Sequence, residues 1–488
     1  SKLLEYAYTH LNYNKHAKEF GKFGGYAYLK TIIDNLKAEA NENTLLLDGG
    51  DAWQGSALSL FEKGKDMVQA SNILGVDVMT GHWEFTFGEK QFIENIKQFN
   101  GDFVAQNIKL TEEAIFDGMT PFDKENHFQK PYVIKEVNNL RVAVIGQAFP
   151  YTPIANPKRF VPNLTFGIQE SDLQFLINHI KSKEKPSVII LLSHNGVDVD
   201  KKMAKTVNGI DIILGGHTHD VLPEPLIIEN RNSKTLVINS GCNGKFISVL
   251  DLKVNNNSFD YRYKLLPIIS NQIKPSHDME SFINKKKQPY NKLLNKVVGK
   301  SNLDLYRRGT FNGSFDQLIC ESMTNVLDTE ISLSPGFRWG PTILANEDIT
   351  MSDIYSHTAI TYPNTYIREI SGEGIKNILE DVADNIFNPD PYLQQGGDMV
   401  RTSGLSYEIT PKNHINNRIN NLKTINGKAI ESQKIYKVSG WAGVNQEETG
   451  KPIWNITREY LQSIKFFDAT SVTQPKIIYE NNNIGIET

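Results

Sequence analysis

Apolar runs and amphipathic segments alternate from residue 24 to about 250, and this alternation constrains the fold more than any other feature. Segments such as GGYAYLKTIIDNLKAEA and FIENIKQFN have helical spacing, whereas the short runs between them are typical of buried strands. Each run ends in a cluster of Gly, Asp, Asn or His; the runs are TLLLDGGD, VDVMT, DFVAQN, RVAVIGQA, SVIILLSH, IDIILGG and TLVINSG. Open α/β sheets place ligands at the carboxyl ends of their strands. The pattern therefore predicts an α/β (α+β) domain of packed sheets with helices outside and a site at the strand ends.

A second domain is expected because 488 residues are too many for one hydrophobic core. The first domain is predicted over residues 1–267. Residues 268–298 pass Pro275 and then take on charged, amphipathic spacing, which predicts a linking helix. Mixed helix and strand signals follow, so residues 299–488 are predicted to form a smaller α/β domain.

Charge and composition argue against several classes of partner. A formal charge of −4 gives no reason to expect nucleic acid or an anionic membrane. No window approaches the roughly eighteen uninterrupted apolar residues of a membrane span. The two cysteines, Cys242 and Cys320, are better explained as small hydrophobic residues than as a disulfide, so they leave the compartment open.

Side chains suited to metal binding stand at the ends of these strands. They are Asp48, Asp51, His82, Asn107, His194, His217 and His219. A single histidine there is most simply a neutral imidazole bonded to a loop carbonyl, but four histidines and an aspartate together favour a metal centre. His217 and His219 point to one face of an extended segment and could serve two neighbouring ions, with Asp51 as the bridge. Imidazole with carboxylate suits Mn, Fe or Zn better than Mg or Ca.

Four segments, GGDAWQG, GHWEF, SHNG and GGHTH, occur in the order found in the calcineurin-like metallophosphoesterase domain of the 5′-nucleotidase superfamily, which the chain resembles. The resemblance implies a four-layer αββα domain followed by a smaller α/β substrate-binding domain of the 5′-nucleotidase type. A narrower resemblance, to the SoxB family of thiosulfohydrolases, extends from about residue 20 to 445. The segments that carry it are GHWEFTFG, GQAFPYTPIANP, SHNGVDVD, GGHTHD, GFRWG, TYPNTY and GGDMVRTSG. Of these, GHWEF and AFPYTPIANP are specific, whereas GGHTH alone indicates only the superfamily.

The resemblance implies two metal ions, expected to be Mn²⁺, with Zn²⁺ or Fe as alternatives. One ion would be held by Asp51, His82, His194 and His217. The other would be held by Asp51, His219 and two ligands from a D-x-H motif on a first strand. No D-x-H motif precedes Asp48, so we expect that this sequence starts after that strand and that the second site is incomplete in it. A mononuclear protein, or His10 as a substitute ligand, is the alternative.

The segment GHWEFT departs from the superfamily motif GNHEFD in an instructive way. Where the motif has Asn, His and Asp, this chain has His82, Trp83 and Thr86. In the phosphatases that the chain resembles, the motif histidine protonates the leaving alkoxide, and the motif Asp orients that histidine. The SoxB reaction instead expels a persulfide, which needs little help from a general acid. Trp83 is then either an apolar wall beside the substrate channel or simply a packed aromatic side chain.

Two arginines of the second domain are candidates for binding a sulfonate or phosphate. Arg338 in GFRWG and Arg401 in GGDMVRTSG stand on Gly-rich segments, and guanidinium groups match such anions in a bidentate way. A solvated surface charge is the plain alternative for each. Asn107 is expected to orient the substrate or a bridging water, with a structural amide as the alternative, and Asp48 is expected to serve a turn.

The resemblance implies a periplasmic hydrolase that releases sulfate from a cysteine S-thiosulfonate on a SoxYZ-type sulfur-carrier protein, and that works as a monomer. A 5′-nucleotidase or cyclic-nucleotide phosphodiesterase is the first alternative. It predicts an aromatic pair that sandwiches a purine, for which Phe337 and Trp339 are the candidates, but the absent His–Asp pair counts against it. The other alternative is a carrier-binding module without catalysis, and the presence of His194 and His217 counts against that.

Overall fold

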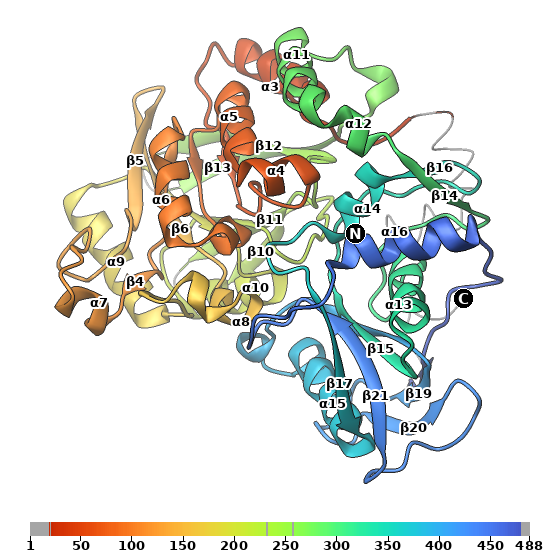
Figure 1. Ribbon diagram of the computed structural model, residues 1–488. Helices are drawn as coiled ribbons and strands as arrows, with labels where there is room; N and C mark the ends of the chain where they lie inside the picture. Colours follow the sequence, from red (N-terminus) through yellow and green to blue (C-terminus); the bar gives the residue numbers. More distant parts are fainter. Residues whose placement is uncertain (1–18, 20, 231–232, 256–257, 480–488) are drawn as a thin grey trace. The chain divides into compact units, whose positions relative to one another are not determined.

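The chain divides into two units, which are described separately (Figure 1). The first consists of Ser1–Gln54 and Phe61–Pro289, and the second of Gly55–Leu60 and Tyr290–Thr488. This computed structural model describes residue 19 and residues 21–230, 233–255 and 258–479. His10, the alternative ligand considered above, lies outside the described residues.

The largest element of the first unit is a six-stranded sheet with the order β10-β11-β9-β8-β6-β5. Its four inner strands are parallel, and the two edge strands β5 and β10 are antiparallel to their neighbours. The strands are β5 (Tyr132–Val137), β6 (Leu140–Gln147), β8 (Val188–Ser193), β9 (Ile212–Gly215), β10 (Leu226–Glu229) and β11 (Lys234–Asn239). The carboxyl ends of β8 and β9 therefore lie at the same edge of the sheet.

A second, smaller sheet contains three parallel strands, β1 (Leu47–Asp48), β2 (Val78–Met79) and β3 (Asp102–Phe103). A long antiparallel hairpin, β12 (Phe246–Asn255) and β13 (Ser258–Pro267), follows later in the chain. The chain after β3 meets the large sheet at Gly146, where a Cβ atom would lie 1.9 Å from the carbonyl oxygen of Val104. A glycine is required at this contact between the two sheets.

Side-chain alternation along the strands separates the layers of the first unit. On β6, Val142 and Val144 face a core shared with Val78 of the small sheet and with the hairpin, whereas Ala143 and Ile145 face the helices on the other side. Helices α9 (Glu170–Lys183) and α10 (Val197–Thr206) cover that side. Helices α3 (Tyr26–Glu39), α5 (Lys65–Leu74), α6 (Glu89–Gln98) and α11 (His277–Lys287) cover the outer face of the small sheet (Figure 1). The fold class predicted from the sequence is confirmed.

Short elements complete the first unit. They are η1 (Trp83–Phe87), β4 (Lys109–Leu110), α7 (Glu112–Phe116), α8 (Thr152–Ala155), η2 (Lys158–Phe160), β7 (Leu164–Thr165) and η3 (Ser270–Gln272). Most of α4 (Ala57–Glu62) belongs to the segment Gly55–Leu60 of the second unit. The linking helix predicted over 268–298 is not continuous: α11 is followed by η4 (Gln288–Tyr290) and α12 (Asn291–Leu294). Pro289 explains the break, because its ring removes a backbone donor and clashes with the preceding turn.

The second unit is built on a four-stranded sheet with the order β17-β21-β15-β18. Those strands are β15 (Ile331–Gly336), β17 (Thr365–Ser371), β18 (Asp398–Ser403) and β21 (Ile435–Trp441). Two three-stranded sheets complete its strands, one made of β14 (Val297–Ser301), β16 (Asp348–Thr350) and β22 (Phe466–Phe467), the other of β19 (Leu405–Ile409), β20 (Ile419–Thr424) and β23 (Lys476–Ile477). The helices are α13 (Ser314–Leu327), α14 (Met351–Thr358), α15 (Gly372–Phe387), η5 (Pro391–Leu393) and α16 (Ile453–Ile464). A capping box of Thr350 and Asp353 fixes the start of α14.

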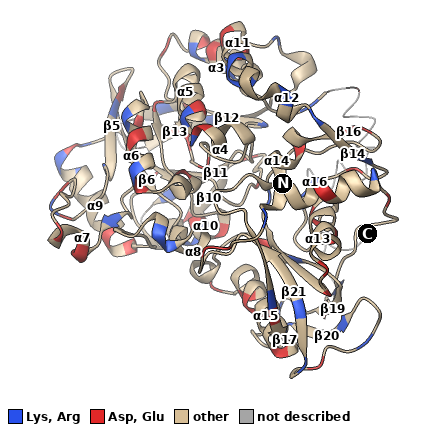
Figure 2. Cartoon of the chain, viewed as in Figure 1, with Lys and Arg blue, Asp and Glu red and all other residues tan. Residues whose placement is uncertain are grey.

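Helix α11 carries residues of both charge signs along its length (Figure 2). Within the described ranges, no helix combines the length and the apolar character needed to cross a bilayer.

Candidate metal centre

Three histidine imidazoles form a buried cluster in the first unit. One ring nitrogen from each of His82, His194 and His217 lies within 4.8 Å of the others. His82 follows β2 of the small sheet, whereas His194 and His217 follow β8 and β9 of the large sheet. The strand-end positions named from the sequence thus converge from two different sheets.

Asp51 completes this cluster with a carboxylate. Its Oδ2 lies 3.7 Å from Nδ1 of His82 and 3.6 Å from Nε2 of His194. The turn that brings it there is tight: Gly50 and Asp51 both have positive φ, +92° and +70°. A Cβ on Gly50 would lie 2.7 Å from the carbonyl oxygen of Thr80, so only glycine fits.

Backbone strain is concentrated at these residues. His217 and His219 have φ of +69° and +59°, the left-handed region that L-residues with large side chains rarely adopt. Such a conformation costs about 1–3 kcal/mol per residue and persists where surrounding contacts enforce it. Strain at Asp51, His217 and His219 together indicates that side-chain placement in these loops outweighs local backbone preference.

The protonation of His194 is fixed by its backbone partner. Its Nδ1 lies 2.6 Å from the carbonyl oxygen of Gly49, and because a carbonyl only accepts, Nδ1 must carry the proton. The neutral ring therefore presents a lone pair at Nε2, and this buried nitrogen has no hydrogen-bond partner among the described residues. A lone pair held toward a carboxylate 3.6 Å away is the arrangement expected of a metal ligand.

Electrostatics couples Asp51 to the imidazoles. Burial alone would raise the pKa of the Asp51 carboxyl, but His82 and His194 outweigh burial and hold this pKa well below its usual range. Burial likewise works to lower the pKa of His194, yet the Asp51 carboxylate raises it overall. The Asp51 carboxylate is therefore held in its charged form by positive charge on the neighbouring imidazoles. A bound cation would supply that positive charge in their place and leave the imidazoles neutral.

Glu84 holds the two loops of the cluster together. Its carboxylate accepts the backbone N–H of Ala52 at 2.7 Å and that of His82 at 2.6 Å, and its side chain is fully buried. Burial, with a smaller contribution from Asp51, raises the pKa of Glu84 to about 7. Glu84 is not among the site residues predicted from the sequence. The available signal was a carboxylate between the apolar Trp83 and Phe85, where burial demands partners.

The other residues named in this unit differ in their surroundings. His219 lies in the same loop as His217, is partly buried, and is outside the group of mutually close nitrogen atoms. Asp48 accepts the N–H of Gly50 at 3.0 Å, as expected for a turn residue. The Asn107 side chain donates to the carbonyls of Ala148 and Gly167 and accepts from Ala148 N–H. Asn107 thus holds the backbone at Ala148 and Gly167 in place, and its predicted role in orienting the substrate or a bridging water stays a prediction.

The two arginines of the second unit have unlike environments. Arg338 follows β15 on a loop and is partly exposed, as a residue that meets a ligand must be. Arg401 on β18 is fully buried, with Nε 3.2 Å from Asp316 and one terminal nitrogen 3.0 Å from Asp398. Its other terminal nitrogen donates to the carbonyl of Thr310 at 3.0 Å. An anion could reach Arg401 only by displacing these partners, so the geometry favours a structural ion pair over the predicted anion clamp.

Phe337 and Trp339, the aromatic pair considered for a purine, stack on each other. Their ring centroids lie 4.1 Å apart at an interplanar angle of 18°. A base between two rings needs about 3.5–4.0 Å on each of its faces. The pair as it stands leaves no room between its rings.

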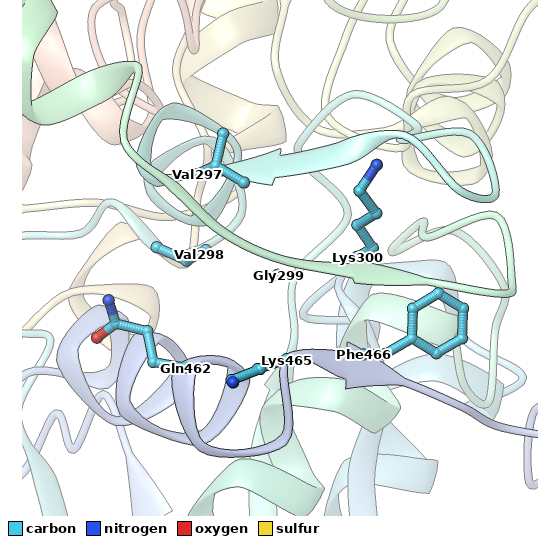
Figure 3. A pocket seen from close by; sticks show the side chains of 7 residues that line it. All are labelled: Val297, Val298, Gly299, Lys300, Gln462, Lys465 and Phe466. Atoms are coloured by element: carbon cyan, nitrogen blue, oxygen red, sulfur yellow. The ribbon is translucent and has the colours of Figure 1, made fainter.

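A surface hollow in the second unit lies between β14 and the end of α16 (Figure 3). Its lining is Val297, Val298, Gly299, Lys300, Gln462, Lys465 and Phe466. It contains none of the residues named from the sequence, and the histidine cluster belongs to the other unit.

Among solved structures, the sulfate thiohydrolase SoxB of Thermus thermophilus is similar to this chain at 32% identity and a TM-score of 0.88, covering 96% of this chain and 86% of that one. The chain belongs to the 5′-nucleotidase superfamily of metal-dependent hydrolases. The family description "5′-nucleotidase, C-terminal domain" matches residues 296–454. A 5′-nucleotidase precursor, also of Thermus thermophilus, shares the fold, with a TM-score of 0.81 at 20% identity over 94% of each chain.

Curated relatives within the superfamily match more distantly. The trifunctional nucleotide phosphoesterase YfkN of Bacillus subtilis is 24% identical over 84% of this chain, which spans 30% of that protein. The 5′-nucleotidase of Bos taurus is 27% identical over 62% of this chain and 54% of its own length. The chain thus spans about a third to about half of these relatives. Members of the superfamily use two metal ions, and the donors of the cluster, imidazoles with a carboxylate, fit Mn, Fe or Zn.

Proposed function

We propose that the chain is a SoxB-like thiosulfohydrolase. Its substrate is a carrier protein whose cysteine bears an S-thiosulfonate, Cys–S–S–SO₃⁻. Water adds its oxygen to the sulfonate sulfur, the S–S bond breaks, and the bonding electron pair stays with the carrier as a persulfide. The products are Cys–S–S⁻, SO₄²⁻ and two protons, so atoms and charge balance.

The observation that carries this proposal is the position of Trp83 beside the cluster. Its indole ring centroid lies 5.1 Å from that of His82, at the motif position where the superfamily phosphatases have the histidine that protonates the leaving group. An indole N–H is a donor that does not titrate near neutral pH, so Trp83 cannot serve as a general acid. A leaving alkoxide needs such an acid and a persulfide needs it far less.

The residues Asp51, His82, His194 and His217 would hold one metal ion, and His219 with Asp51 would contribute to a second, for which Mn²⁺ is proposed. Bound divalent cations supply Lewis-acid polarisation and lower the pKa of water. The chain itself contributes the fixed His194 tautomer and the tether from Glu84 to the loops of Asp51 and His82.

Arg338 is proposed to bind the sulfonate oxygens, because a partly exposed guanidinium can reach an anion and pair with it in a bidentate way. Trp83 is proposed to form an apolar wall along the path of the carrier's cysteine arm. The partner is a SoxYZ-type carrier, and the compartment proposed is the periplasm. The likeness to the sulfate thiohydrolase SoxB, at 32% identity, supports the sulfate-releasing activity on which these assignments depend.

Nucleotide hydrolysis is the second candidate, favoured by curated relatives named 5′-nucleotidase. Two features speak against it. Trp83 and Thr86 replace the His–Asp pair of the phosphatase motif, and the stacked Phe337 and Trp339 leave no room for a purine between them.

The test uses a synthetic peptide of a carrier arm bearing cysteine S-thiosulfonate and the Mn²⁺-loaded protein. Sulfate is measured by ion chromatography and the peptide product by mass spectrometry. The proposal expects sulfate and peptide persulfide in equal amounts, and neither product with the His194→Ala variant. Absence of sulfate release by the metal-loaded protein would overturn it.

A further inference from the structure

The motif AFPYTPIANP places one aromatic ring against two imidazoles of the cluster. The Phe149 ring centroid lies 4.1 Å from that of His217, nearly parallel at 24°, and 4.2 Å from that of His82 at 45°. Its side chain is 1% exposed. His194 lies further off, at 6.4 Å, and has the Gly49 carbonyl to orient it instead.

Phe149 is itself held from three directions. Its backbone N–H donates to the carbonyl oxygen of Gly81 at 3.0 Å, the residue directly before His82. The hydroxyl of Thr152 donates to the Phe149 carbonyl at 2.8 Å. Asn107 fixes the preceding residue, Ala148, by donating to its carbonyl and accepting its N–H, both at 2.8 Å.

These contacts matter because an imidazole ligates only when its nitrogen lone pair points at the ion. Metal-binding histidines are commonly oriented by a hydrogen bond from the second ring nitrogen. A flat ring packed against His217 and His82 restricts rotation of both imidazoles about their last side-chain bond. Ring packing then acts on these two histidines as the Gly49 carbonyl acts on His194.

We propose that Phe149 is a positioning residue that holds His82 and His217 in their ligating orientation, and that Asn107 acts through it. The role concerns ion binding and holds whichever bond the enzyme cleaves. It gives a function to the AFPYTPIANP segment, through Phe149, and to the buried Asn107 amide, through its bonds to Ala148.

The test compares substitutions of two buried phenylalanines. Phe149→Leu and Phe149→Met remove the ring, and Met keeps most of the volume, so it remains informative if the Leu variant does not fold. Phe92→Leu and Phe92→Met are matched controls, since Phe92 is also fully buried and its neighbours are the rings of Trp53, Phe85, Phe103 and Phe128. Mn²⁺ affinity is measured by calorimetry, and ligand geometry by the visible spectrum of the Co²⁺-loaded protein. Circular dichroism checks folding.

The expected result is a loss of Mn²⁺ affinity of about tenfold or more, with an altered Co²⁺ spectrum, in the Phe149 variants alone. Asn107→Ala should lower the affinity in the same direction, and an unchanged affinity would overturn the part assigned to Asn107. Wild-type affinity and spectrum in Phe149→Met would overturn the proposal while leaving the metal centre intact. A wild-type protein that binds no metal would overturn the metal centre and this proposal together.

Discussion

The backbone N–H of Trp83 donates to Oδ1 of Asp51 over 3.3 Å, while the Trp83 indole packs beside His82. The residue at this position is therefore anchored to the proposed bridging carboxylate by its main chain, and its side chain reaches the edge of the histidine cluster. Trp83 is buried, at 5% exposure, so a substitution here changes the immediate surroundings of His82.

Replacing this side chain tests whether its chemistry decides which bond is cleaved. The double substitution Trp83→His with Thr86→Asp restores the His–Asp pair of the phosphatase motif and leaves His82 in place. We expect phosphate release from AMP to rise by about 10²-fold or more, the usual contribution of a general acid. Thr86→Asp alone is the control. It should give no gain in phosphate release, because without a histidine at position 83 the new carboxylate has no imidazole to orient. A double variant that folds and binds Mn²⁺ yet gains no phosphatase activity would contradict this account of Trp83.

Removal of one ligand should abolish both metal binding and turnover. His194→Ala takes away the buried Nε2 lone pair that faces Asp51. We expect Mn²⁺ affinity to fall by about 100-fold or more and sulfate release to disappear. His179→Ala, an exposed histidine on α9, is the control. Chelation should silence the wild type and added Mn²⁺ should restore it; activity that survives thorough chelation would rule out the metal centre.

The contrasting environments of Arg338 and Arg401 predict that replacing Arg338 weakens substrate binding, whereas replacing Arg401 lowers the stability of the fold. Arg338→Met should raise KM about tenfold or more, which is the effect expected from the loss of one charge-assisted hydrogen bond to the substrate. It should not lower the melting temperature. Arg401→Met leaves one oxygen of the fully buried Asp316, and the partly buried Asp398, without their charged partner, so it should cost about 3–5 kcal/mol of unfolding free energy. Steady-state kinetics and thermal unfolding of both variants separate the two roles. A raised KM with unchanged stability in Arg401→Met would restore it as an anion clamp.

The buried His357 predicts a pH dependence of stability. Burial, reinforced by the charge of Arg307, lowers the pKa of His357 from 6.5 to about 3. Between these values the unfolded chain takes up a proton that the folded chain does not, so this residue makes stability fall as the pH falls below 6.5. His357→Phe removes the proton site and preserves the stack on Phe315, whose centroid lies 3.8 Å away.

Urea unfolding at pH 7.5 and pH 5.5 checks this. Between the two pH values, the wild type should lose about 1.4 kcal/mol more unfolding free energy than His357→Phe. The exposed His179→Gln variant should behave like the wild type. Equal losses in wild type and His357→Phe would show that His357 does not contribute.

The strand-end positions of the cluster residues could be predicted from the sequence, because His82, His194 and His217 each come directly after a buried strand or its turn. The meeting of His82 with the other two histidines also depends on how the two sheets pack, because β2 belongs to one sheet and β8 and β9 to the other. The linking helix was mispredicted as continuous because helical spacing extends across Pro289, which interrupts it.

The roles of single polar residues could not be predicted in the same way. Arg401 and Arg338 both stand near glycines, and only the folded sheet shows that Arg401 lies in a fully buried stretch of β18 and pairs with Asp316. Glu84 and Phe149 have partners that are distant in sequence, since Glu84 accepts from Ala52 and Phe149 packs on His217. Contacts of this kind depend on how the two sheets pack, which periodicity does not encode.

The most direct test of the central claim is a comparison of two specificity constants in one Mn²⁺-loaded preparation. One is kcat/KM for sulfate release from the cysteine S-thiosulfonate peptide, and the other is kcat/KM for phosphate release from AMP. His194→Ala serves as the blank for both reactions. With Trp83 in place of a general acid, we predict that the sulfate reaction exceeds the phosphate reaction by about 10²-fold or more. Phosphate release as efficient as sulfate release would contradict the thiosulfohydrolase assignment.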